Sequence, residues 1–394
     1  MAELAQSLRD DAFVQDPYPF YARAMSMGDL FVWQDMATVA AASHRSVSWL
    51  LRSKDWGREM PAALGPEPAV EIEPFARLDR CSMLELDPPR HTRLRKLVNR
   101  AFTSRNIANM EPEIESLTHQ ILDHLPQRTE LQTEFCEQLP VRVIARLLGV
   151  ADDMCPQMLS WSHDMVAMYQ ARRDQEVQRR ACAAAQAFTQ FITSEITRRR
   201  RQKSDDLMSQ LVAVEDQEGG LSTDELVSTC ILLLNAGHEA TANSLGNGIK
   251  TILESGLDPV EILSPPQRTS TVEEILRFDP PLHVFERYAR CDNELFGHNF
   301  RCGDKIALIL ASANRDPSVW EQADSFLPMR NATGHCSFGA GIHFCVGAPL
   351  ARLELAIGLA AIFQRFPHIS LASEPRYADR YHFHGLEELW VCLD

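Results

Sequence analysis

The chain has 394 residues, of which 45% are hydrophobic and 24% charged, a composition typical of a globular protein that buries a substantial core. Its formal net charge of −15 argues against a nucleic-acid-binding protein, because phosphate contacts require a concentration of Lys and Arg. Residues 1–20 contain no basic start followed by an apolar run. We therefore expect no signal peptide and no membrane anchor, and we expect a cytoplasmic protein.

Apolar residues recur at helical spacing through much of the chain. The predicted helices are 112–125, 137–149, 178–200, 224–253 and 348–365. Short strand-like stretches, several of them beside Gly or Asn, lie at 29–34, 284–296, 304–309 and in the C-terminal tail. These patterns predict a mainly α fold with small β-sheets. No linker or internal repeat divides the sequence, so we expect a single domain over 1–394.

A basic segment follows Pro88 and Pro89. Prolines favour the first turn of a helix, so the segment should be helical. His91 and Arg95 then lie one turn apart, and both side chains can reach the same anion. The other basic residues of the segment are Arg90, Arg93, Lys96 and Arg100. Taken alone, this pattern is equally that of a solvated basic face.

One long helix is expected over 222–254, because Ser222 and Glu225 have capping-box spacing and a strongly apolar run follows them. Small residues and an acid interrupt this run in the sequence Ala236-Gly237-His238-Glu239-Ala240-Thr241. Successive side chains on an α-helix differ by about 100° in direction, so neighbouring residues of this stretch face different surroundings.

The most informative stretch is the glycine-rich loop Phe338-Gly339-Ala340-Gly341-Ile342-His343-Phe344-Cys345-Val346-Gly347, which leads into an apolar helix. Its glycines allow positive φ and close backbone approach, as a flat cofactor would require. Cys345 lies where the helix begins, and a helix N-terminus stabilises a thiolate. Two other interpretations are a buried structural cysteine and a zinc site. The zinc site would be formed by His335, Cys336, His343 and Cys345.

This loop resembles the F-G-x-G-x-H-x-C-x-G haem loop of the cytochrome P450 family. The sequence Glu274-Ile-Leu-Arg277 resembles the E-x-x-R motif of the same family. Its spacing alone favours an i,i+3 surface pair, but the Pro280-Pro281 break and the downstream loop favour the motif. The motifs occur in the family's order over nearly the whole chain. The resemblance implies the cytochrome P450 fold and one b-type haem, with the thiolate of Cys345 bound to the iron and pushing electron density toward O–O cleavage.

The resemblance also implies roles for other residues. Those expected to contact the haem are His91, Arg95, Gly237, Arg287, Phe338, Gly339, His343, Cys345 and Gly347. Four of them are expected by resemblance to bind the haem propionates, namely His91, Arg95, Arg287 and His343. Glu274, Arg277 and Arg330 are expected to form a buried charged triad, in which the loss of one partner leaves an uncompensated charge.

The stretch 236–241 resembles the oxygen-activation motif A-G-x-(D/E)-T, and here the sequence departs from the family. Glu239 keeps the acid, but Ala240 stands where threonine is usual and has no hydroxyl. Thr241 is the next residue and faces a different direction. We therefore expect the catalytic residues Glu239, Ala240 and Thr241 to work with a substrate hydroxyl or an ordered water that completes the proton path. The alternative is that Ala240 is neutral and waters alone carry protons. His238 is expected to have a packing role.

The implied activity is that of a monooxygenase, which inserts one atom of O2 into a small lipophilic substrate. The chain has no flavin motif and no clustered iron–sulfur cysteines, so a ferredoxin and ferredoxin reductase are the expected electron donors. The basic segment at 90–100 is the expected docking surface for the ferredoxin. We expect a monomer. One alternative is a hydrogen-peroxide-dependent peroxygenase, which the missing threonine favours and which Glu239 and the basic segment disfavour. The other is a haem-thiolate binding or sensor protein without turnover.

Substrate selection is assigned by resemblance to 56–86, 155–178, the long helix, 282–286 and the tail around Gly385 and Leu386. The expected pocket residues are Leu282, His283, Val284, Phe285 and Met168. His283 either orients a polar substrate group or faces solvent in a loop. Met165, Met168 and Tyr169 form either a mobile lid or ordinary packing.

Overall fold

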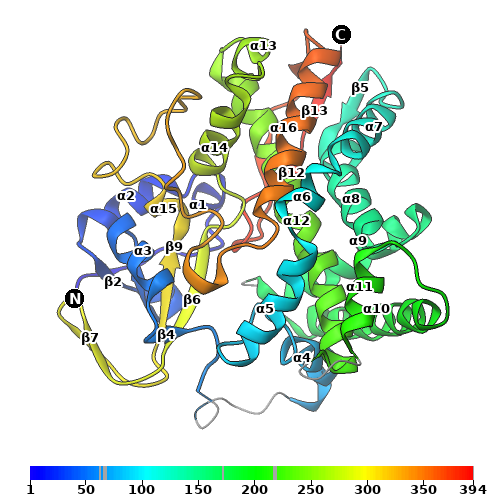
Figure 1. Ribbon diagram of the computed structural model, residues 1–394. Coiled ribbons are helices and arrows are strands. Elements are labelled where there is room, and N and C mark those ends of the chain that lie inside the picture. The colour runs from blue at the N-terminus through cyan, green and yellow to red at the C-terminus, as the bar shows by residue number, and fades with distance from the viewer. Residues whose placement is uncertain (62–63, 65–68, 171–172, 216–219, 394) are drawn as a thin grey trace. The chain divides into compact units, whose positions relative to one another are not determined.

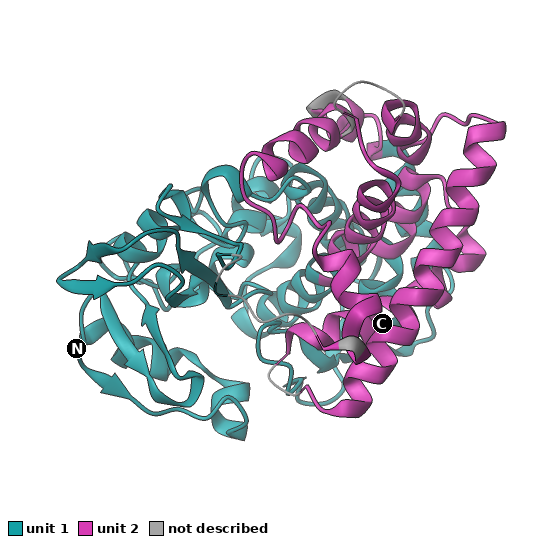
Figure 2. Cartoon of the chain, turned by 90° about the horizontal axis from the view of Figure 1, so that it is seen from below, with its two compact units in different colours: residues 1–64, 112–139, 240–394 teal, residues 65–111, 140–239 magenta. Residues whose placement is uncertain are grey.

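The computed structural model describes residues 1–61, 64, 69–170, 173–215 and 220–393. The chain forms two compact units (Figure 2). Unit 1 comprises 1–64, 112–139 and 240–394, and unit 2 comprises 65–111 and 140–239. The long helix α12, Thr223–Ser255, is continuous across the boundary between Glu239 and Ala240. The expectation of a single domain over 1–394 stays a prediction.

The regular structure of unit 2 is entirely helical over its described residues. Its elements are η2 Val70–Ile72, α4 Glu73–Asp79, α5 Arg90–Ala101, α6 Ser104–Ala108, most of α8 Gln138–Leu148, η4 Asp152–Met154, α9 Cys155–Val166, η5 Ala167–Tyr169, α10 Gln175–Arg201, α11 Leu207–Glu215 and the first half of α12. The side chain of Asp174 caps α10 by accepting from the Val177 amide at 2.8 Å. Ser222 and Glu225 form the predicted capping box, each side chain bonding to the other's backbone N–H.

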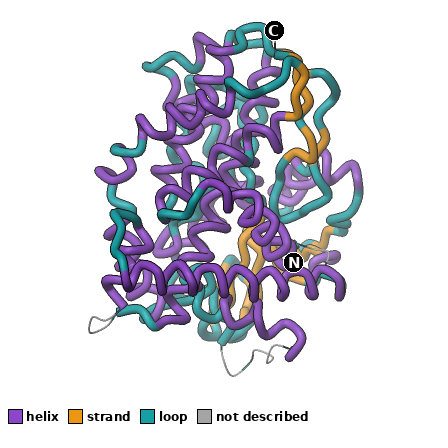
Figure 3. The backbone as a smooth tube through the Cα atoms, turned by 90° about the vertical axis from the view of Figure 1, so that its right-hand side faces the viewer, coloured by secondary structure: helices purple, strands orange, loops and turns teal. Residues whose placement is uncertain are grey.

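Unit 1 combines helices with all the strands of the described chain. Its helical elements are α1 Asp11–Gln15, α2 Tyr18–Ser26, η1 Gln34–Met36, α3 His44–Arg52, most of α7 Glu111–Leu122, the π-helical turn η3 Gln132–Cys136, the second half of α12, α13 Pro259–Ile262, α14 Arg268–Phe278, α15 Leu310–Ala313, η6 Gly341–His343 and α16 Ala348–Arg365. Helix dominates and the strands are short, as Figure 3 shows.

The largest sheet of the described residues has six strands in the order β1-β2-β3-β9-β6-β4. These strands are β1 Glu3–Leu4, β2 Leu30–Trp33, β3 Thr38–Ala41, β9 Lys305–Ile309, β6 Val284–Ala289 and β4 Trp56–Gly57. β3 and β9 are parallel, with Val39 opposite Ile306, whereas β6 and β9 are antiparallel. The smaller sheets contain β7 Asn293–Leu295 with β8 His298–Phe300, β10 Ser370–Leu371 with β13 Trp390–Cys392 and β5 Arg128–Glu130, and β11 Arg376–Tyr377 with β12 Leu386–Glu388.

The six-stranded sheet buries a different apolar cluster on each face, because successive side chains of a strand point in opposite directions. One cluster joins Ile306 and Leu308 of β9 to α3 and to Cys336 and Ala340 of the glycine-rich loop. The other joins Ala307 and Ile309 to α1 and α2. The sheet therefore holds the loop on the same face as α3 (Figure 1).

The predicted helices agree closely with the structure, and 348–365 coincides with α16. The predicted strand 284–296 is two strands, β6 and β7. A tight turn follows β7, in which Phe296 and Gly297 both have positive φ, of 48° and 76°, as a two-residue hairpin requires. Among the described residues, no helix is both long enough and apolar enough to span a membrane.

Candidate active site

The glycine-rich loop of unit 1 is held by its own backbone and by α3. The Cys345 amide donates to the Phe338 carbonyl at 2.9 Å, and the Gly339 amide donates to the Cys336 carbonyl at 2.8 Å. Gly339 and Gly341 have φ of +66° and +71°, in the left-handed region that favours glycine. A Cβ at Gly341 would lie 2.5 Å from the Leu51 carbonyl oxygen, so only glycine allows the loop to pack on α3.

Cys345 lies two residues before Gly347, the N-cap of α16. A Cβ at Gly347 would lie 3.8 Å from the Cys345 sulfur, so the sulfur is beside the first turn of this 18-residue helix. The side chain is half-buried. Unpaired amides and the helix dipole at such a position stabilise a thiolate. A thiolate is a suitable ligand for a haem iron, and the glycines allow a flat cofactor to approach the loop closely. The residues present therefore fit a haem whose iron is bound by the Cys345 sulfur.

Phe285 and Arg287 lie on one face of β6, since they are two residues apart. The ring of Phe285 is 3.2 Å from the position that a Cβ of Gly339 would occupy, so this face of the strand meets the glycine-rich loop. Arg287 is 3% exposed and donates to the Glu286 carbonyl at 2.8 Å. His343 is half-buried in η6 of the same loop. Two of the expected propionate contacts therefore belong to elements that contact each other.

The other two expected propionate contacts, His91 and Arg95, lie one turn apart on α5 of unit 2. His91 is 2% exposed, and burial together with the charge of Arg95 lowers its pKa, so the imidazole is neutral near pH 7. Arg93 does not extend the expected basic docking surface. Its guanidinium pairs with Glu225 at the start of α12 and donates to the Gly220 carbonyl at 2.7 Å. Arg90, Lys96 and Arg100 are exposed.

The motif 236–241 lies in the middle of α12. A Cβ at Gly237 would lie 2.7 Å from Ile144 of α8, so close helix packing requires glycine here. Glu239 is 8% exposed and its carboxylate faces histidines. Thr241 is 6% exposed. The carbonyl of Ala240 accepts from the Ser244 hydroxyl at 2.8 Å. The hydrogen bond of Ser244 to this carbonyl was not predicted. The spacing of four residues between Ala240 and Ser244 is the sequence signal that could have indicated it.

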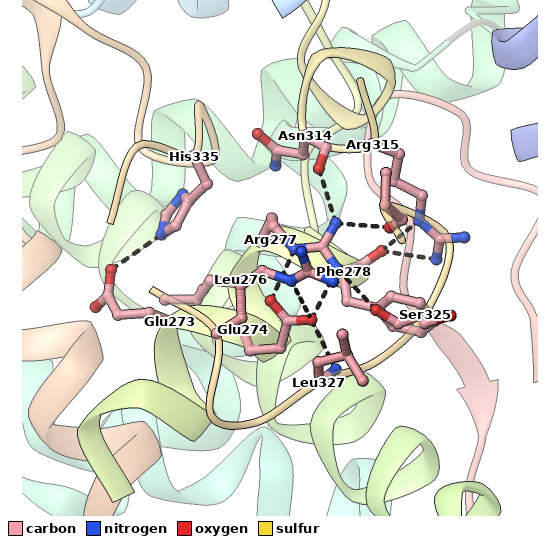
Figure 4. Close-up of polar contacts among 12 residues, drawn as sticks. Glu273, Glu274, Leu276, Arg277, Phe278, Asn314, Arg315, Ser325, Leu327 and His335 are labelled. Atoms are coloured by element: carbon pink, nitrogen blue, oxygen red, sulfur yellow. Dashed lines mark hydrogen bonds and ion pairs between the residues drawn. The ribbon is translucent and has the colours of Figure 1, made fainter. Parts of the chain in front are cut away.

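Glu274, Arg277 and Arg330 come together in unit 1, as expected for the triad. Arg277 donates to both carboxylate oxygens of Glu274 at 2.7 and 2.8 Å, and Arg330 donates to Glu274 at 3.3 Å. The side chains of Glu274 and Arg277 have no exposed surface. Arg277 also donates to the carbonyls of Asn314, Ala323 and Ser325, as Figure 4 shows in part. This cluster joins α14 to the segment that leads to the glycine-rich loop.

A second cluster beside it was not predicted. Glu273 accepts from His335 at 3.2 Å and from Arg352 at 2.9 Å, and the Arg352 guanidinium lies 4.5 Å from the centre of the Phe338 ring. Burial raises the pKa of Glu273, but the hydrogen bonds from His335 and Arg352 outweigh it and lower the pKa to about 2. α14 and α16 therefore hold both ends of the loop. The only sequence signal was the adjacent pair Glu273-Glu274.

This cluster excludes the zinc interpretation of the loop. His335 uses Nε2 for Glu273 and Nδ1 for the Ser337 amide. Cys336 is 3% exposed in an apolar cluster, and burial raises the pKa of its thiol to about 11. Both ring nitrogens of His335 are in use and Cys336 is packed among apolar side chains, so neither residue is available to bind zinc together with Cys345.

Two expected pocket residues are buried in unit 1. His283 is 1% exposed and bonds through Nδ1 to the Tyr21 hydroxyl at 2.9 Å, so the alternative of a loop histidine that faces solvent is wrong. Val284 belongs to the apolar cluster of α1 and α2. The chain enters β6 on the side of these helices, and they bury both residues.

The remaining pocket candidates lie elsewhere. Leu282 forms an isolated bridge with Phe383, and Phe285 contacts the glycine-rich loop. Met168 in η5 is 4% exposed. Of the residues expected to form either a lid or ordinary packing, Met165 is buried and accepts from Asn235, whereas Tyr169 is exposed and donates to Asp79 at 2.8 Å. The predicted substrate segments 56–86 and 155–178 fall partly on 62–63, 65–68 and 171–172, which lie outside the described residues.

A mainly helical fold that presents one cysteine from a glycine-rich loop, just before a long helix, defines a haem-thiolate protein. The comparisons with known proteins identify the family. The family model described as Cytochrome P450 matches residues 57–254 and 266–379. The chain belongs to the cytochrome P450 family, and it is a P450 monooxygenase whose cofactor is a haem with an axial cysteine thiolate.

Two curated relatives come from bacteria. The 6-deoxyerythronolide B hydroxylase of Saccharopolyspora erythraea is 34% identical over 403 residues, which cover 98% of each chain. The polyketide biosynthesis cytochrome P450 PksS of Bacillus subtilis is 38% identical over 318 residues, which cover 79% of this chain and 77% of PksS. Among solved structures, P450BioI in complex with hexadec-9Z-enoic acid ligated acyl carrier protein has a TM-score of 0.92 and 29% identity. That match covers 97% of this chain and 100% of P450BioI.

Proposed function

We propose that this monooxygenase inserts one atom of O2 into a small lipophilic organic substrate, with electrons from a ferredoxin and its reductase and with Cys345 as the axial ligand. The observation that carries the proposal is the half-buried Cys345, held at the N-terminus of α16 by a loop that only glycines allow. The bound haem supplies the activation of O2. The chain's own residues bind the cofactor, exclude water and move protons.

The haem contacts we propose are His91, Arg95, Gly237, Arg287, Phe338, Gly339, His343, Cys345 and Gly347. Arg287 supports this assignment, because a guanidinium that is 3% exposed on the face of β6 that meets the loop suits a carboxylate brought in by a cofactor. His91 supports it as a buried imidazole that can donate a hydrogen bond. The triad of Glu274, Arg277 and Arg330 supports the segment that leads to the glycine-rich loop, and we assign it no direct contact with the cofactor.

Protons reach the oxygen site through Glu239 and Thr241 together with a substrate hydroxyl or an ordered water. Ala240 has no hydroxyl, and the Ser244 hydroxyl already donates its hydrogen bond to the carbonyl of Ala240. The acid of the motif is present as Glu239, which is 8% exposed. Its carboxyl group can therefore exchange protons both with water and with groups in the interior. A restored hydroxyl at position 240 should therefore compete with this path.

The axial ligand is tested by the absorption spectrum of the dithionite-reduced protein under carbon monoxide. We expect the red-shifted Soret band characteristic of thiolate-ligated haem, its loss in Cys345→Ser and its retention in Cys291→Ser, which changes an exposed cysteine. A folded protein without haem, or an unchanged band in Cys345→Ser, would refute the assignment.

The reaction is tested with NADPH, a surrogate ferredoxin and its reductase. The lipophilic probes are 6-deoxyerythronolide B and hexadec-9Z-enoic acid, which the relatives' names suggest. We expect a product that carries one added oxygen and requires all three components. Product formation from hydrogen peroxide alone would establish the peroxygenase alternative, and probe binding without NADPH consumption would establish the sensor alternative.

Ala240→Thr tests the proton path. We expect the ratio of product formed to NADPH consumed to change, because the new hydroxyl donates a hydrogen bond where Ala240 cannot. The control is Ala183→Thr, the same substitution at an exposed position of α10. An unchanged ratio in both variants would show that position 240 has no part in proton delivery.

A further inference from the structure

Three potential metal ligands face one another in unit 2. His163 lies on α9, and His238 and Glu239 are consecutive on α12. The Glu239 carboxylate oxygen Oε2 lies 3.7 Å from Nε2 of His163 and 3.8 Å from Nε2 of His238. All three donor atoms lie within 4.8 Å of one another. The two distances from Glu239 exceed those of hydrogen bonds, so the three groups converge without bonding directly.

His238 has one ring nitrogen committed and the other available. Nδ1 lies 2.8 Å from the Leu234 carbonyl oxygen, which can only accept, so the proton is on Nδ1 and the lone pair is on Nε2. Nε2 has no hydrogen-bond partner among the described residues, although the side chain is only 2% exposed. Burial lowers the pKa of His238 and keeps the ring neutral. Metal-bound histidines typically have this arrangement, with the second nitrogen on a carbonyl.

The donor set and the access to it also suit a metal. Two imidazoles and one carboxylate form a common zinc site, with ligands about 2.0–2.2 Å from the ion and a fourth position open to water. Ligand atoms in such a tetrahedron are about 3.4 Å apart. The two distances from Glu239, 3.7 and 3.8 Å, therefore need to contract by about 0.3–0.4 Å, and the distance between the two histidine nitrogens, at most 4.8 Å, by at most about 1.4 Å. The side chain of His163 is 38% exposed, which gives an ion a route from solvent.

We propose that His163, His238 and Glu239 form a binding site for a divalent transition-metal ion such as Zn2+. This site uses none of the residues of the glycine-rich loop, and it goes beyond the proposed monooxygenase function. Occupancy fixes the Glu239 carboxylate on the ion and withdraws it from proton transfer. Zinc therefore inhibits substrate oxidation wherever Glu239 is the proton donor.

The test is calorimetric titration of the chelator-treated holoenzyme with Zn2+ near neutral pH. We expect one tight site. Loss of a hydrogen bond that only orients a metal ligand lowers metal affinity by roughly 10- to 100-fold. Loss of a ligand should cost at least as much, so we expect His163→Ala and Glu239→Gln each to lower the zinc affinity by at least this factor. His119→Ala removes an exposed histidine of α7 and should leave the site intact. The carbon monoxide spectrum of each variant shows that it is folded and holds haem.

Crystals soaked in Zn2+ locate the ion directly. Diffraction data collected on both sides of the zinc absorption edge should give a difference peak among the three side chains, distinct from the haem iron. Equal zinc affinity in the wild type and His163→Ala, or a peak only at other residues, would overturn the proposal. Neither readout needs turnover, so failure of the proposed oxidation would not be mistaken for failure of the metal site.

Discussion

At the scale of single residues, buried charged side chains support the glycine-rich loop that carries Cys345. Glu274 and Arg277 have no exposed side-chain surface, and their hydrogen bonds to each other and to surrounding carbonyls satisfy both groups. A buried pair of this kind adds little net stability, but removing one member leaves the other charge without compensation. An exposed pair has no such penalty, because water replaces the lost partner.

We therefore expect Arg277→Ala to lower the free energy of unfolding by about 3–5 kcal/mol and to reduce haem retention. Arg77→Ala is the matched control, since Arg77 and Asp224 form an exposed ion pair with a 2.9 Å contact. Its expected cost is below about 1 kcal/mol. Denaturant unfolding of both variants measures the difference, and equal costs would contradict the proposed burial effect.

At the scale of elements, α12 is fitted to its neighbours by small residues. Gly237 contacts Ile144 of α8 in unit 2. In unit 1, a Cβ added at Gly246 would lie only 2.3 Å from Oε1 of Gln132. Gly358 of α16 likewise lies close to Leu245 and Leu139. Glycine normally weakens a helix by about 1 kcal/mol relative to alanine. Its presence here is explained by close packing between helices.

Gly237→Ala should therefore lower the free energy of unfolding by about 1–2 kcal/mol, because overpacking exceeds the gain in helix propensity. In an Ile144→Ala background the same change should become neutral or stabilising, with a coupling energy of at least about 1 kcal/mol. Val143→Ala removes the neighbouring buried side chain of α8 and should not rescue the variant. The absence of any coupling to Ile144 would show that Gly237 is kept for another reason.

At the scale of the whole molecule, a buried polar cluster in unit 1 ties the N-terminal helices to the C-terminal segment. The Asp279 carboxylate accepts from Tyr18 at 3.1 Å and from Tyr377 at 2.5 Å, and it lies 3.4 Å from His384. His384 stacks on Tyr377, with ring centres 3.8 Å apart. Burial, with the charges of Lys250 and Arg315, lowers the pKa of His384 to about 3.

This shift predicts a loss of stability in mild acid. The folded state binds fewer protons than the unfolded state between about pH 6.5 and 3, so the contribution of His384 is complete above 6.5 and falls as the pH decreases. Between about pH 7.5 and 5.5 the wild type should lose about 1.4 kcal/mol more than His384→Gln. His119→Gln, at an exposed site, should behave as the wild type. The same pH dependence in the wild type and His384→Gln would refute the mechanism.

The sequence alone determined those features that are local in the chain. Helical periodicity located α7, α8, α10, α12 and α16, because an amphipathic pattern is contained within one segment. The glycine-rich loop could also be identified from the sequence, since its glycines and Cys345 lie within ten consecutive residues. The triad of Glu274, Arg277 and Arg330 came from family resemblance, and the structure brings its members together.

Only the tertiary structure decided which partner each polar side chain meets. His283 bonds to Tyr21, which is 262 residues away, and Glu273 joins His335 and Arg352. Arg93 pairs with Glu225, where the sequence indicated a solvated face. The physical reason is that a sequence pattern records the spacing of side chains along one element. The burial and pairing of a polar group depend on which other element packs against it.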